Sequence, residues 1–303
     1  YAADGSLKGL LIEEQRANLV PNSEDFSQSL FGAGGGSITS TNNPSPSGLN
    51  TATLVTATSG RVYLYTSISL SGATNKDYTA SCWVKGVAEG TTARLRIGFF
   101  GGAQGGSFTT GTYENLSTTE WTRISLAGVS SESDRSSAQL VVETETENQL
   151  IVWGAQLEEG SFATSYISTS GATVTRSPDI ASILVSAFGY NEDAGTVLVE
   201  AQTVANQAAT SRILSFDDGI SNDDSIQIAV LSGGTSVYLE ARDDVTVQVS
   251  GTSGSINSAA APFRVAYAFA TDDYAASVDG GTLFTDTTAS VPNEITQLNI
   301  GSY

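Results

Sequence analysis

Short segments that alternate apolar and polar residues, each closed by Gly, Ser, Asn or Asp, run through the whole chain. In Arg94–Phe99, the residues Leu95, Ile97 and Phe99 fall on one side of an extended backbone, and Tyr78–Val84 alternates in the same way. A period of two is typical of β-strands that bury one face. Helical periodicity over eleven or more residues is hard to find. The sequence therefore predicts an all-β protein.

The strand signals form two series, separated by the small, polar stretch Ile167–Pro178, where Pro178 interrupts any hydrogen-bond ladder. The predicted strands of the first series are Arg61–Thr66, Tyr78–Val84, Arg94–Phe99, Trp121–Leu126, Gln139–Val142 and Gln149–Trp153. Those of the second are Thr196–Glu200, Ser211–Phe216, Ser225–Val230, Ser236–Glu240, Val245–Val249, Phe263–Phe269, Tyr274–Val278 and Gln297–Ile300. Asp279–Gly280 predicts a hairpin turn. We therefore predict two tandem antiparallel β-sandwiches, residues 1–177 and 178–303.

Composition excludes several function classes. The 303 residues include 13 basic and 32 acidic side chains, one cysteine and no histidine. Without histidine there is no Ser-His-Asp triad, Cys-His dyad or His-ligated zinc, and one cysteine forms no intrachain disulfide. A net charge of −19 offers no basic footprint for nucleic acid. No apolar run reaches the ~18 residues of a membrane-spanning helix. We expect neither nucleic-acid binding nor membrane insertion.

The charge is unevenly distributed between the two predicted domains. Residues 1–177 hold 10 basic and 16 acidic side chains, whereas residues 178–303 hold 3 basic and 16 acidic ones and no lysine. The net charges are therefore −6 and −13. This contrast supports two domains with different surfaces.

Two long motifs carry a family resemblance. Gly9–Val20 reads G-L-L-I-E-E-Q-R-A-N-L-V, Asn22–Ser27 follows as N-S-E-D-F-S, and Trp153–Thr169 reads W-G-A-Q-L-E-E-G-S-F-A-T-S-Y-I-S-T. In this order they resemble paired boxes of bacteriophage head-spike and tail-fibre proteins, over residues 5–180. We expect the motif to be structural, since Arg–carboxylate pairs hold loops in fixed geometry. Its residues are Glu13, Glu14, Arg16, Asn18, Trp153 and Gln156.

The resemblance also implies folds for both halves. Residues 1–177 are similar to jelly-roll carbohydrate-binding modules. Residues 178–303 more weakly resemble a concanavalin-like or laminin-G-like sandwich, on Phe263–Ala268, Tyr274–Gly281 and Ile295–Ser302. Chains of this kind continue past the last of these strands and enter the first box from upstream. The resemblance therefore implies further sequence beyond both ends of this chain.

Function follows from the resemblance as an expectation. It implies a virion appendage, a head spike or tail fibre on the virion surface, that adheres to host-surface glycan. Such fibres are usually homotrimers that also contact other virion proteins, and three linked weak sites raise avidity. Two alternatives remain open: a purely structural decoration protein without ligand, and a polysaccharide depolymerase. We expect no enzymatic activity.

Acidic loops raise the question of calcium, which takes six to eight oxygen ligands. The densest patch consists of Asp217, Asp218, Asn222, Asp223 and Asp224, and Asp243–Asp244 and Asp272–Asp273 add further carboxylates. The alternative is that these residues form solvated turns, because the spacing does not match an EF-hand. Carbohydrate-binding jelly rolls suggest a second calcium position, for which Glu24 and Asp25 are candidates. The last strand of this domain lacks the Asp pair that would complete it.

Glycan binding requires aromatic platforms with polar edges. The candidates are Tyr63, Tyr65, Tyr113, Tyr238 and Tyr274, although an aromatic residue in an alternating strand is more often part of a core. Trp83, Trp121 and Trp153 have apolar neighbours and are predicted to be core anchors.

Two further features are assigned structural roles. Glu143, Glu145 and Glu147 would lie on one face of a strand, where like charges repel each other. They therefore predict an exposed or edge strand. Cys82 is predicted to be a small buried hydrophobe.

Overall fold

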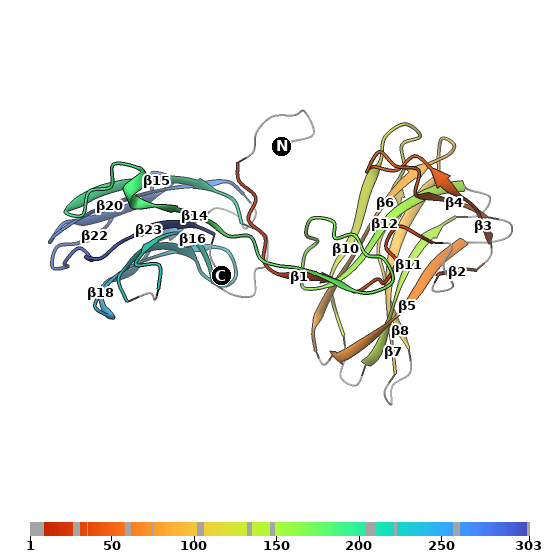
Figure 1. The fold of residues 1–303 in the computed structure, drawn as a ribbon, viewed down its shortest axis with the longest axis horizontal. Helices are drawn as coiled ribbons and strands as arrows, with labels where there is room; N and C mark the ends of the chain where they lie inside the picture. The colour runs from red at the N-terminus through yellow and green to blue at the C-terminus, as the bar shows by residue number, and fades with distance from the viewer. Residues whose placement is uncertain are drawn as a thin grey trace. The chain divides into compact units, whose positions relative to one another are not determined.

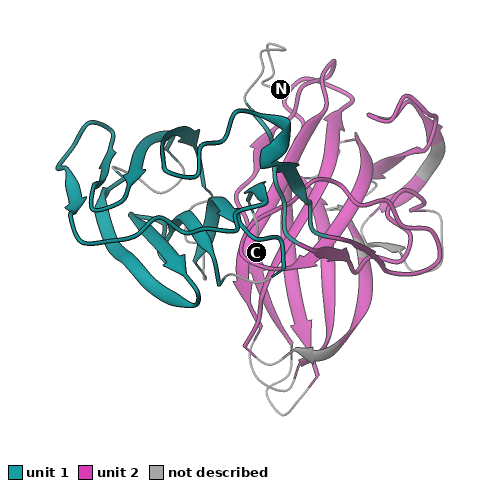
Figure 2. Ribbon diagram, turned by 60° about the vertical axis from the view of Figure 1, so that its left-hand side comes forward, with its two compact units in different colours: residues 1–14, 178–303 teal, residues 15–177 magenta. Residues whose placement is uncertain are grey.

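The computed structural model describes residues 9–26, 31–34, 36–57, 62–73, 75–101, 106–131, 135–145, 149–203, 210–220, 223–256 and 261–301. The chain divides into two compact units (Figure 2). Unit 1 comprises residues 1–14 and 178–303, and unit 2 comprises residues 15–177. The predicted boundary before Pro178 coincides with that division, but residues 1–14 group with the C-terminal sandwich rather than with the domain they precede.

Unit 2 is a sandwich of two antiparallel sheets (Figure 1). One sheet has the order β10-β6-β12-β4-β3 and the other β2-β5-β11-β7-β8, with β9 also paired to β7; β1 and β13 form a separate pair. The strands are β1 (Arg16–Asn18), β2 (Phe31–Gly34), β3 (Gly36–Asn43), β4 (Ala52–Ala57), β5 (Val62–Ala73), β6 (Asp77–Gly86), β7 (Thr92–Phe100), β8 (Ser107–Thr110), β9 (Glu114–Asn115), β10 (Thr122–Ser130), β11 (Arg135–Thr144), β12 (Gln149–Glu159) and β13 (Val174–Arg176).

The core of unit 2 follows the alternation seen in the sequence. Leu95, Ile97 and Phe99 of β7 are buried together with Leu140 and Val142 of β11. Because successive side chains of a strand point to opposite faces, Arg94, Arg96 and Glu143 belong to the outer face of the same sheet. Cys82 is fully buried in this core, as predicted, and burial raises the pKa of its thiol.

Unit 1 is a second sandwich, with one sheet ordered β14-β23-β16-β17-β18-β19 and the other β15-β20-β21-β22. Its strands are β14 (Ala181–Leu184), β15 (Ala194–Ala201), β16 (Ser211–Asp217), β17 (Ser225–Val230), β18 (Ser236–Asp243), β19 (Thr246–Ser255), β20 (Phe263–Ala270), β21 (Tyr274–Val278), β22 (Phe284–Asp286) and β23 (Gln297–Ile300), with a 3₁₀ turn at Val185–Ala187. The core between the two sheets of unit 1 includes Ile226, Leu239 and Tyr267.

The predicted hairpin at Asp279–Gly280 is confirmed. Both residues have positive φ, 50° and 71°, and Gly281 N–H donates to the carbonyl of Val278 at 2.8 Å. Positive φ at both central positions is the geometry of a type I′ turn, which matches the twist of the flanking strands. β21 and β22 pair antiparallel across it.

The predicted class, two antiparallel β-sandwiches, is confirmed by this architecture. Strands Ser225–Val230, Tyr274–Val278 and Gln297–Ile300 have the predicted bounds. In the first series, β2, β3 and β8 were missed, because Gly, Ser and Thr make up half or more of each and leave little alternation of hydrophobicity. β4 was missed as well. Within the described residues, no helix is long and apolar enough to cross a membrane.

Candidate functional site

The outer face of the β7–β11 part of unit 2 brings three charged side chains together. Glu143 projects from β11, whose neighbours on either side are β5 and β7. The backbone register places Glu143 opposite Arg94, while Arg96 lies opposite Val141. Two of the chain's 13 basic residues thus share one strand face with a central glutamate.

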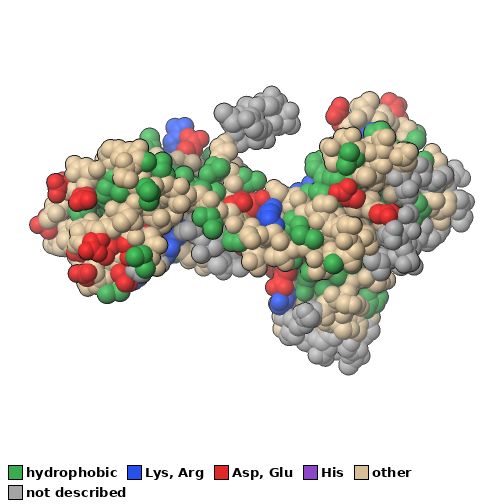
Figure 3. All heavy atoms as spheres, viewed as in Figure 1, with side chains coloured by type: hydrophobic (Ala, Val, Ile, Leu, Met, Phe, Trp, Pro, Cys, Tyr) green, Lys and Arg blue, Asp and Glu red, His purple; other side chains and the backbone are tan. Residues whose placement is uncertain are grey.

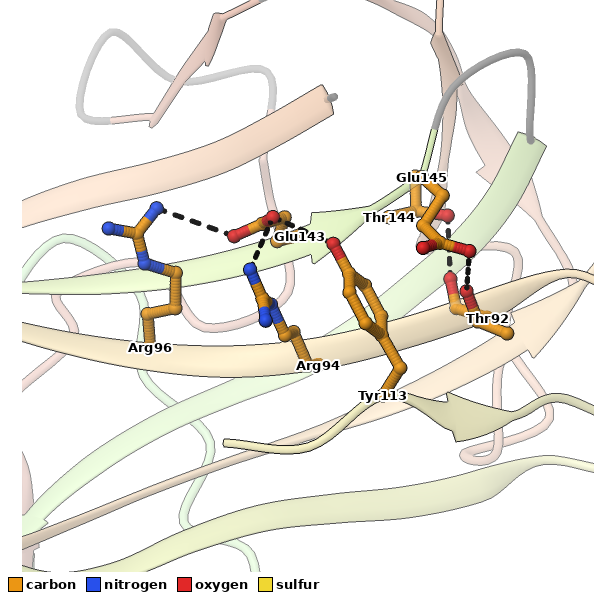
Figure 4. A network of polar contacts seen from close by, with 7 residues as sticks. All are labelled: Thr92, Arg94, Arg96, Tyr113, Glu143, Thr144 and Glu145. Carbon is orange, nitrogen blue, oxygen red and sulfur yellow. Dashed lines mark hydrogen bonds and ion pairs between the residues drawn. The ribbon is translucent and has the colours of Figure 1, made fainter. Parts of the chain in front are cut away.

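Glu143 is fully buried and accepts hydrogen bonds from three side chains (Figure 4). Arg94 Nη2 donates to Oε1 at 2.8 Å, Tyr113 Oη donates to the same oxygen at 2.7 Å, and Arg96 Nη1 donates to Oε2 at 3.3 Å. The side chains of Arg94 and Arg96 remain 17% and 21% exposed. One carboxylate therefore holds two arginines at the surface in a defined geometry.

Burial by itself would raise the pKa of Glu143. Hydrogen bonds from Arg94 and Tyr113, together with the charges of Arg94 and Arg96, outweigh burial, so the pKa of this carboxyl lies below its usual value. Glu143 is therefore ionised at neutral pH, and its hydrogen bonds to the arginines are charge-assisted.

Aromatic rings from the segment that follows β7 lie against its two arginines. The Arg94 guanidinium lies 4.2 Å from the centre of the Tyr113 ring, and that of Arg96 lies 4.4 Å from the centre of the Phe108 ring. Phe108 is 41% exposed and meets Phe100 edge to face at 5.3 Å. We call Tyr113, Arg94, Arg96, Phe108 and Phe100 the arginine–aromatic stripe.

The Phe108 ring packs directly on Gly98. Gly98 lies opposite Phe108 in the β7–β8 pair, and a Cβ at this position would lie 2.4 Å from a ring carbon of Phe108. The ring thus lies directly over the glycine, on the same face as the arginines. This arrangement keeps an aromatic surface at the end of the stripe.

The structure separates the predicted glycan-binding tyrosines. Tyr113 belongs to the stripe, and the backbone register places Tyr63 opposite Glu143 and Tyr65 opposite Val141 of the same sheet; the side chains of both lie outside the described part of the structure. For Tyr274 the prediction is wrong: it is fully buried in the unit 1 core, where its hydroxyl donates to the carbonyl of Ser290. A buried ring cannot offer a face to a sugar. Half-buried Tyr238 bonds to Glu240 in unit 1.

The predicted exposed or edge strand around Glu143 is also wrong. β11 is central in its sheet, and Glu143 is buried because the two arginines and Tyr113 neutralise and cover it. Glu145 is exposed and accepts a hydrogen bond from Thr92, and Glu147 lies outside the described residues. The environment of Glu143 is set by Arg94 and Arg96 on the neighbouring strand β7 rather than by the like charges near it in the sequence.

The carboxylates of the acidic patch predicted to bind calcium do not come together as a group of three within the described residues. Buried Asp217 accepts hydrogen bonds from Ser215, the Gly219 N–H, Gln297 and Asn299, which use its oxygens. Asp224 accepts from the backbone N–H of Asp244. Asp218 and Asp223 do not join them in a group of three or more metal-ligating side chains, and Asn222 lies outside the described part. Asp217 accepts from the N–H of the following turn at Gly219, but Asp217 and Asp224 are both buried, so they are not the solvated turn residues of the alternative.

Glu24 and Asp25, the other calcium candidates, line a polar cavity of about 400 Å³. Its other lining residues are Asn22, Ser168, Thr169, Ser170 and Gly171. Glu24 accepts hydrogen bonds from Tyr166 and Ser168 and from Thr51. These two carboxylates likewise belong to no group of three metal-ligating side chains among the described residues.

The two sequence boxes meet in space. Fully buried Asn18 of the first box donates to the carbonyls of Ala155 and Ile167 at 3.0 and 2.8 Å, and its side-chain oxygen accepts from the N–H groups of Val20 and Leu157. All four hydrogen-bonding positions of its amide are therefore used. Asn18 joins the first box to the second inside unit 2.

The remaining box residues make contacts of the same kind. Gln156 accepts from the Ile167 N–H at 2.8 Å, and the buried Arg16 guanidinium lies 4.8 Å from the centre of the Phe162 ring. Glu13 falls in unit 1, where its N–H donates to Asp179. Glu14 also falls in unit 1 and is half-buried. These contacts agree with a structural role for the motif.

The three tryptophans do not share one environment. Trp153 is buried, donates through Nε1 to Thr51 at 2.9 Å and packs against Tyr166. Trp83 and Trp121 are only half-buried, and Lys85 Nζ lies 5.3 Å from the Trp121 ring centre. The core prediction is therefore wrong for Trp83, which lies on the opposite face of β6 from buried Cys82, and for Trp121, which precedes β10.

Unit 1 contains a related carboxylate centre on β18. Buried Glu240 accepts from Arg242 Nε at 2.6 Å, from Tyr238 Oη at 2.7 Å and from Gln227. Burial would raise the pKa of Glu240, but hydrogen bonds from Arg242 and Tyr238 and the charge of Arg242 lower it overall. In the view of Figure 3, acidic side chains gather on the part of unit 1 that carries β18.

Sequence reasoning missed Arg94, Arg96 and Phe108. The alternation of β7 that predicts its buried face also implies that Arg94 and Arg96 share the other face, and this signal was present in the sequence. The pairing with Glu143 and the position of Phe108 over Gly98 depend on strand order and register, which the sequence does not specify.

Comparisons with known proteins give similarity at the level of fold only. No family model matches the chain, and no curated protein matches it. The N-terminal CBM22-1–CBM22-2 tandem domain of Paenibacillus barcinonensis Xyn10C aligns over 97% of this chain and 92% of its own, with 11% identity and a TM-score of 0.39. Mouse laminin α1 domains LG4-5 align over 79% of each chain, with 8% identity and a TM-score of 0.27.

A phage protein is also among the similar structures. The enzymatically active domain of tailspike protein 4 from bacteriophage CBA120 aligns over 48% of this chain and 21% of its own, with 13% identity and a TM-score of 0.34. The chain therefore corresponds to about a fifth of that tailspike chain. With TM-scores below 0.5, these similarities carry no argument about ligand or activity.

Proposed function

We propose that the chain is a non-catalytic glycan-binding module and that the arginine–aromatic stripe of unit 2 is its binding face. The observation that carries this proposal is the packing of two arginine guanidinium groups against two aromatic rings on one face of a sheet. Sugars present apolar C–H faces to aromatic rings and hydroxyl groups to hydrogen-bonding side chains. The stripe offers both kinds of partner, side by side.

The geometry of the stripe favours binding without large rearrangement. Arg94 and Arg96 are fixed from one side by Glu143 and from another by the rings of Tyr113 and Phe108. Because these side chains are already ordered, a ligand loses less affinity to side-chain entropy. The partly exposed arginine side chains and the exposed Phe108 ring then act as a preformed surface.

More specifically, we propose that the chain is part of a bacteriophage head spike or tail fibre on the virion surface that attaches the particle to host-cell glycan. The two sequence boxes support this assignment to a phage appendage. A homotrimer would present three copies of the stripe and so raise the avidity of a weak individual site.

The binding proposal is tested by applying the full chain to an array of bacterial surface polysaccharides. We expect binding to a subset of them, weakened about fivefold or more by Phe108→Ala, which removes one aromatic contact. Phe188→Ala is the matched control, because Phe188 of unit 1 is exposed to a similar extent, 38% against 41%. Its binding should equal that of the unchanged chain.

Each alternative function has its own outcome in this experiment. A folded chain that binds no polysaccharide on the array would overturn the proposal and favour a structural decoration protein. Release of reducing ends from any polysaccharide would favour a depolymerase instead. Equal loss of binding in both phenylalanine variants would remove the stripe as the site.

A further inference from the structure

The other sheet of unit 2 also carries aromatic and cationic side chains on its outer face. Cys82 and Val84 of β6 are fully buried in the core. Trp83 and Lys85 alternate with them along the strand and therefore belong to the outer face. Lys85 Nζ lies 5.3 Å from the centre of the Trp121 ring, which brings Trp121 to the same face. We call Trp83, Lys85 and Trp121 the tryptophan–lysine face.

The hydrogen-bond donors of the tryptophan–lysine face are not used inside the protein. Among the described residues, the indole N–H groups of Trp83 and Trp121 donate no hydrogen bond, and the Lys85 ammonium group forms no hydrogen bond or ion pair. None of these three nitrogen atoms is buried, so each of them reaches solvent. All three are donors without acceptor capacity. The face therefore suits a ligand that presents oxygen acceptors.

Trp153 differs from the other two tryptophans in exactly this respect. It lies opposite Trp83 in the β6–β12 pair, but its Nε1 donates to Thr51 at 2.9 Å and its ring packs against Tyr166. It is buried, whereas Trp83 and Trp121 are half-buried. Tyr166 of the second sequence box thus covers Trp153 and leaves the neighbouring indole accessible.

The backbone of β12 helps to hold the Trp83 ring in place. Gly154 lies at a register shift between β6 and β12 and has a φ of 65°. A Cβ at Gly154 would lie 3.2 Å from Cδ1 of Trp83 and 3.3 Å from a ring carbon of Tyr166, so the two rings flank this glycine. Bulges of this kind re-aim side chains and are common next to functional sites. A ring that is already ordered loses little side-chain entropy when it binds a ligand.

The tryptophan–lysine face combines apolar and donor surface in the way that a sugar requires. Sugars present C–H faces to aromatic rings and hydroxyl oxygens to hydrogen-bond donors. The two indole rings supply the aromatic surface, and half-buried Ile151, which lies opposite Lys85, extends the apolar part. The ammonium group and the indole N–H groups supply the donors.

We propose that the tryptophan–lysine face is a second carbohydrate-binding site, on the sheet opposite the arginine–aromatic stripe. A sugar ring lies against the indole rings, and its hydroxyl oxygens accept hydrogen bonds from Lys85 and from the indole N–H groups. The inference goes beyond the proposed function, because this site does not depend on the stripe. With one site on each sheet, a single unit 2 engages two segments of a polysaccharide, which raises avidity.

The indole N–H signals of the full chain, labelled with ¹⁵N in its tryptophans and observed by NMR, test this site. Trp83→Phe and Trp121→Phe assign two of the three signals, and the third belongs to Trp153. The probes are short oligosaccharides cut from the bacterial surface polysaccharides of the array. We expect at least one of them to shift the signals of Trp83 and Trp121 and to leave that of Trp153 in place, because its N–H is bonded to Thr51.

Affinities of variants measured with the same oligosaccharides provide the second test. Trp121→Ala should weaken binding about fivefold or more by removing one aromatic contact. Lys85→Gln should weaken it by a similar factor through the loss of a charged donor, with both indole rings kept. Lys76→Gln is the matched control, because Lys76 is the other lysine of unit 2 and pairs with Glu159. Its affinity should equal that of the unchanged chain.

The outcomes separate this site from the stripe. Loss of binding in Phe108→Ala but not in Trp121→Ala or Lys85→Gln would overturn this inference and leave the proposed function intact. The reverse pattern would support this site and remove the stripe. Indole signals that no oligosaccharide moves, or a Trp153 signal that moves as much as the other two, would overturn the inference. Signals of Trp83 and Trp121 that move only with the concentration of the chain would make this face a contact between copies and overturn it as well.

Discussion

Unit 1 and unit 2 each place one buried glutamate on the outer face of a sheet and hold it with an arginine and a tyrosine. In unit 2 this is Glu143, with Arg94, Arg96 and Tyr113. In unit 1 it is Glu240, with Arg242, Tyr238 and Gln227. Both carboxyls have a pKa below the usual value, for the same physical reason.

The two centres differ in charge and in aromatic neighbours. Glu240 has one arginine and a neutral amide, so its charge is balanced, whereas Glu143 has two arginines. Both arginines of unit 2 lie over aromatic rings. A buried glutamate on a sheet is therefore a structural device common to both units. The second arginine and the rings are what make unit 2 the candidate binding face.

Glu143→Gln should have the largest effect on stability. It leaves two arginines beside a neutral amide, and breaking a buried ion cluster of this kind costs about 3 kcal/mol. Urea unfolding followed by tryptophan fluorescence measures unit 2 alone, because Trp83, Trp121 and Trp153 all belong to it. Glu145→Gln, on the exposed end of the same strand, is the control. A loss below about 1 kcal/mol for Glu143→Gln would mean that the cluster is not coupled to folding.

Glu240→Gln should destabilise unit 1 by less, about 1.5 kcal/mol, because a single and more exposed arginine loses its partner. The loss should appear in calorimetry as an earlier unit 1 transition, with the fluorescence transition of unit 2 unchanged. A loss equal to that of Glu143→Gln would contradict the distinction between the two centres.

Acid should remove part of the same stabilisation from both units. A carboxyl whose folded pKa is lowered contributes stability that is fully present above its unfolded pKa, about 4.3, and is lost as pH falls through the folded value. Unfolding free energies measured from pH 6 down to pH 3 should therefore fall for the unchanged chain. The slope below pH 4 should be shallower for unit 2 in Glu143→Gln and for unit 1 in Glu240→Gln. Parallel slopes would contradict the assignment.

Tyr113→Phe and Tyr238→Phe should each cost about 1 kcal/mol, the loss of one hydrogen bond to a carboxylate. The ring that lies against Arg94 is kept in Tyr113→Phe, so any loss reports the hydroxyl. Unfolding of each unit, measured as above, should show similar losses. A negligible effect in one unit would show that its arginines alone hold the glutamate.

Lys76→Met should have the smallest effect, within about 0.5 kcal/mol, because the Lys76–Glu159 pair is exposed on both sides. Fluorescence-detected urea unfolding of unit 2 provides the measurement. A loss comparable to that of Glu143→Gln would mean that burial does not separate the two kinds of ion pair.

The fold was largely predictable from local pattern. Strands such as Tyr274–Val278 and the Asp279–Gly280 turn were found because alternation and positive φ are properties of a few consecutive residues. Glycine- and serine-rich strands such as β2 and β8 were missed, because their ladders depend on neighbouring strands rather than on their own hydrophobicity.

The candidate site was only partly predictable. Tyr113 was among the glycan candidates, but Tyr274 has the same residue type in a similar pattern and proved to be a core residue. Residue type gives the chemistry a side chain can perform. Which face of a strand is covered depends on the packing of the second sheet.

By itself, the sequence determined the class of fold, the two-part organisation and the absence of histidine chemistry, because these follow from local periodicity and composition. Only the tertiary structure decided that Glu143 is buried rather than exposed to solvent. Read along the chain, it is one of three like charges that should repel one another and face solvent. Strand order places it between β5 and β7, and the arginines of β7 turn an expected repulsion into a buried, ionised centre. Electrostatic partners are set by distance in space, and that distance is fixed by register between strands that lie far apart in sequence.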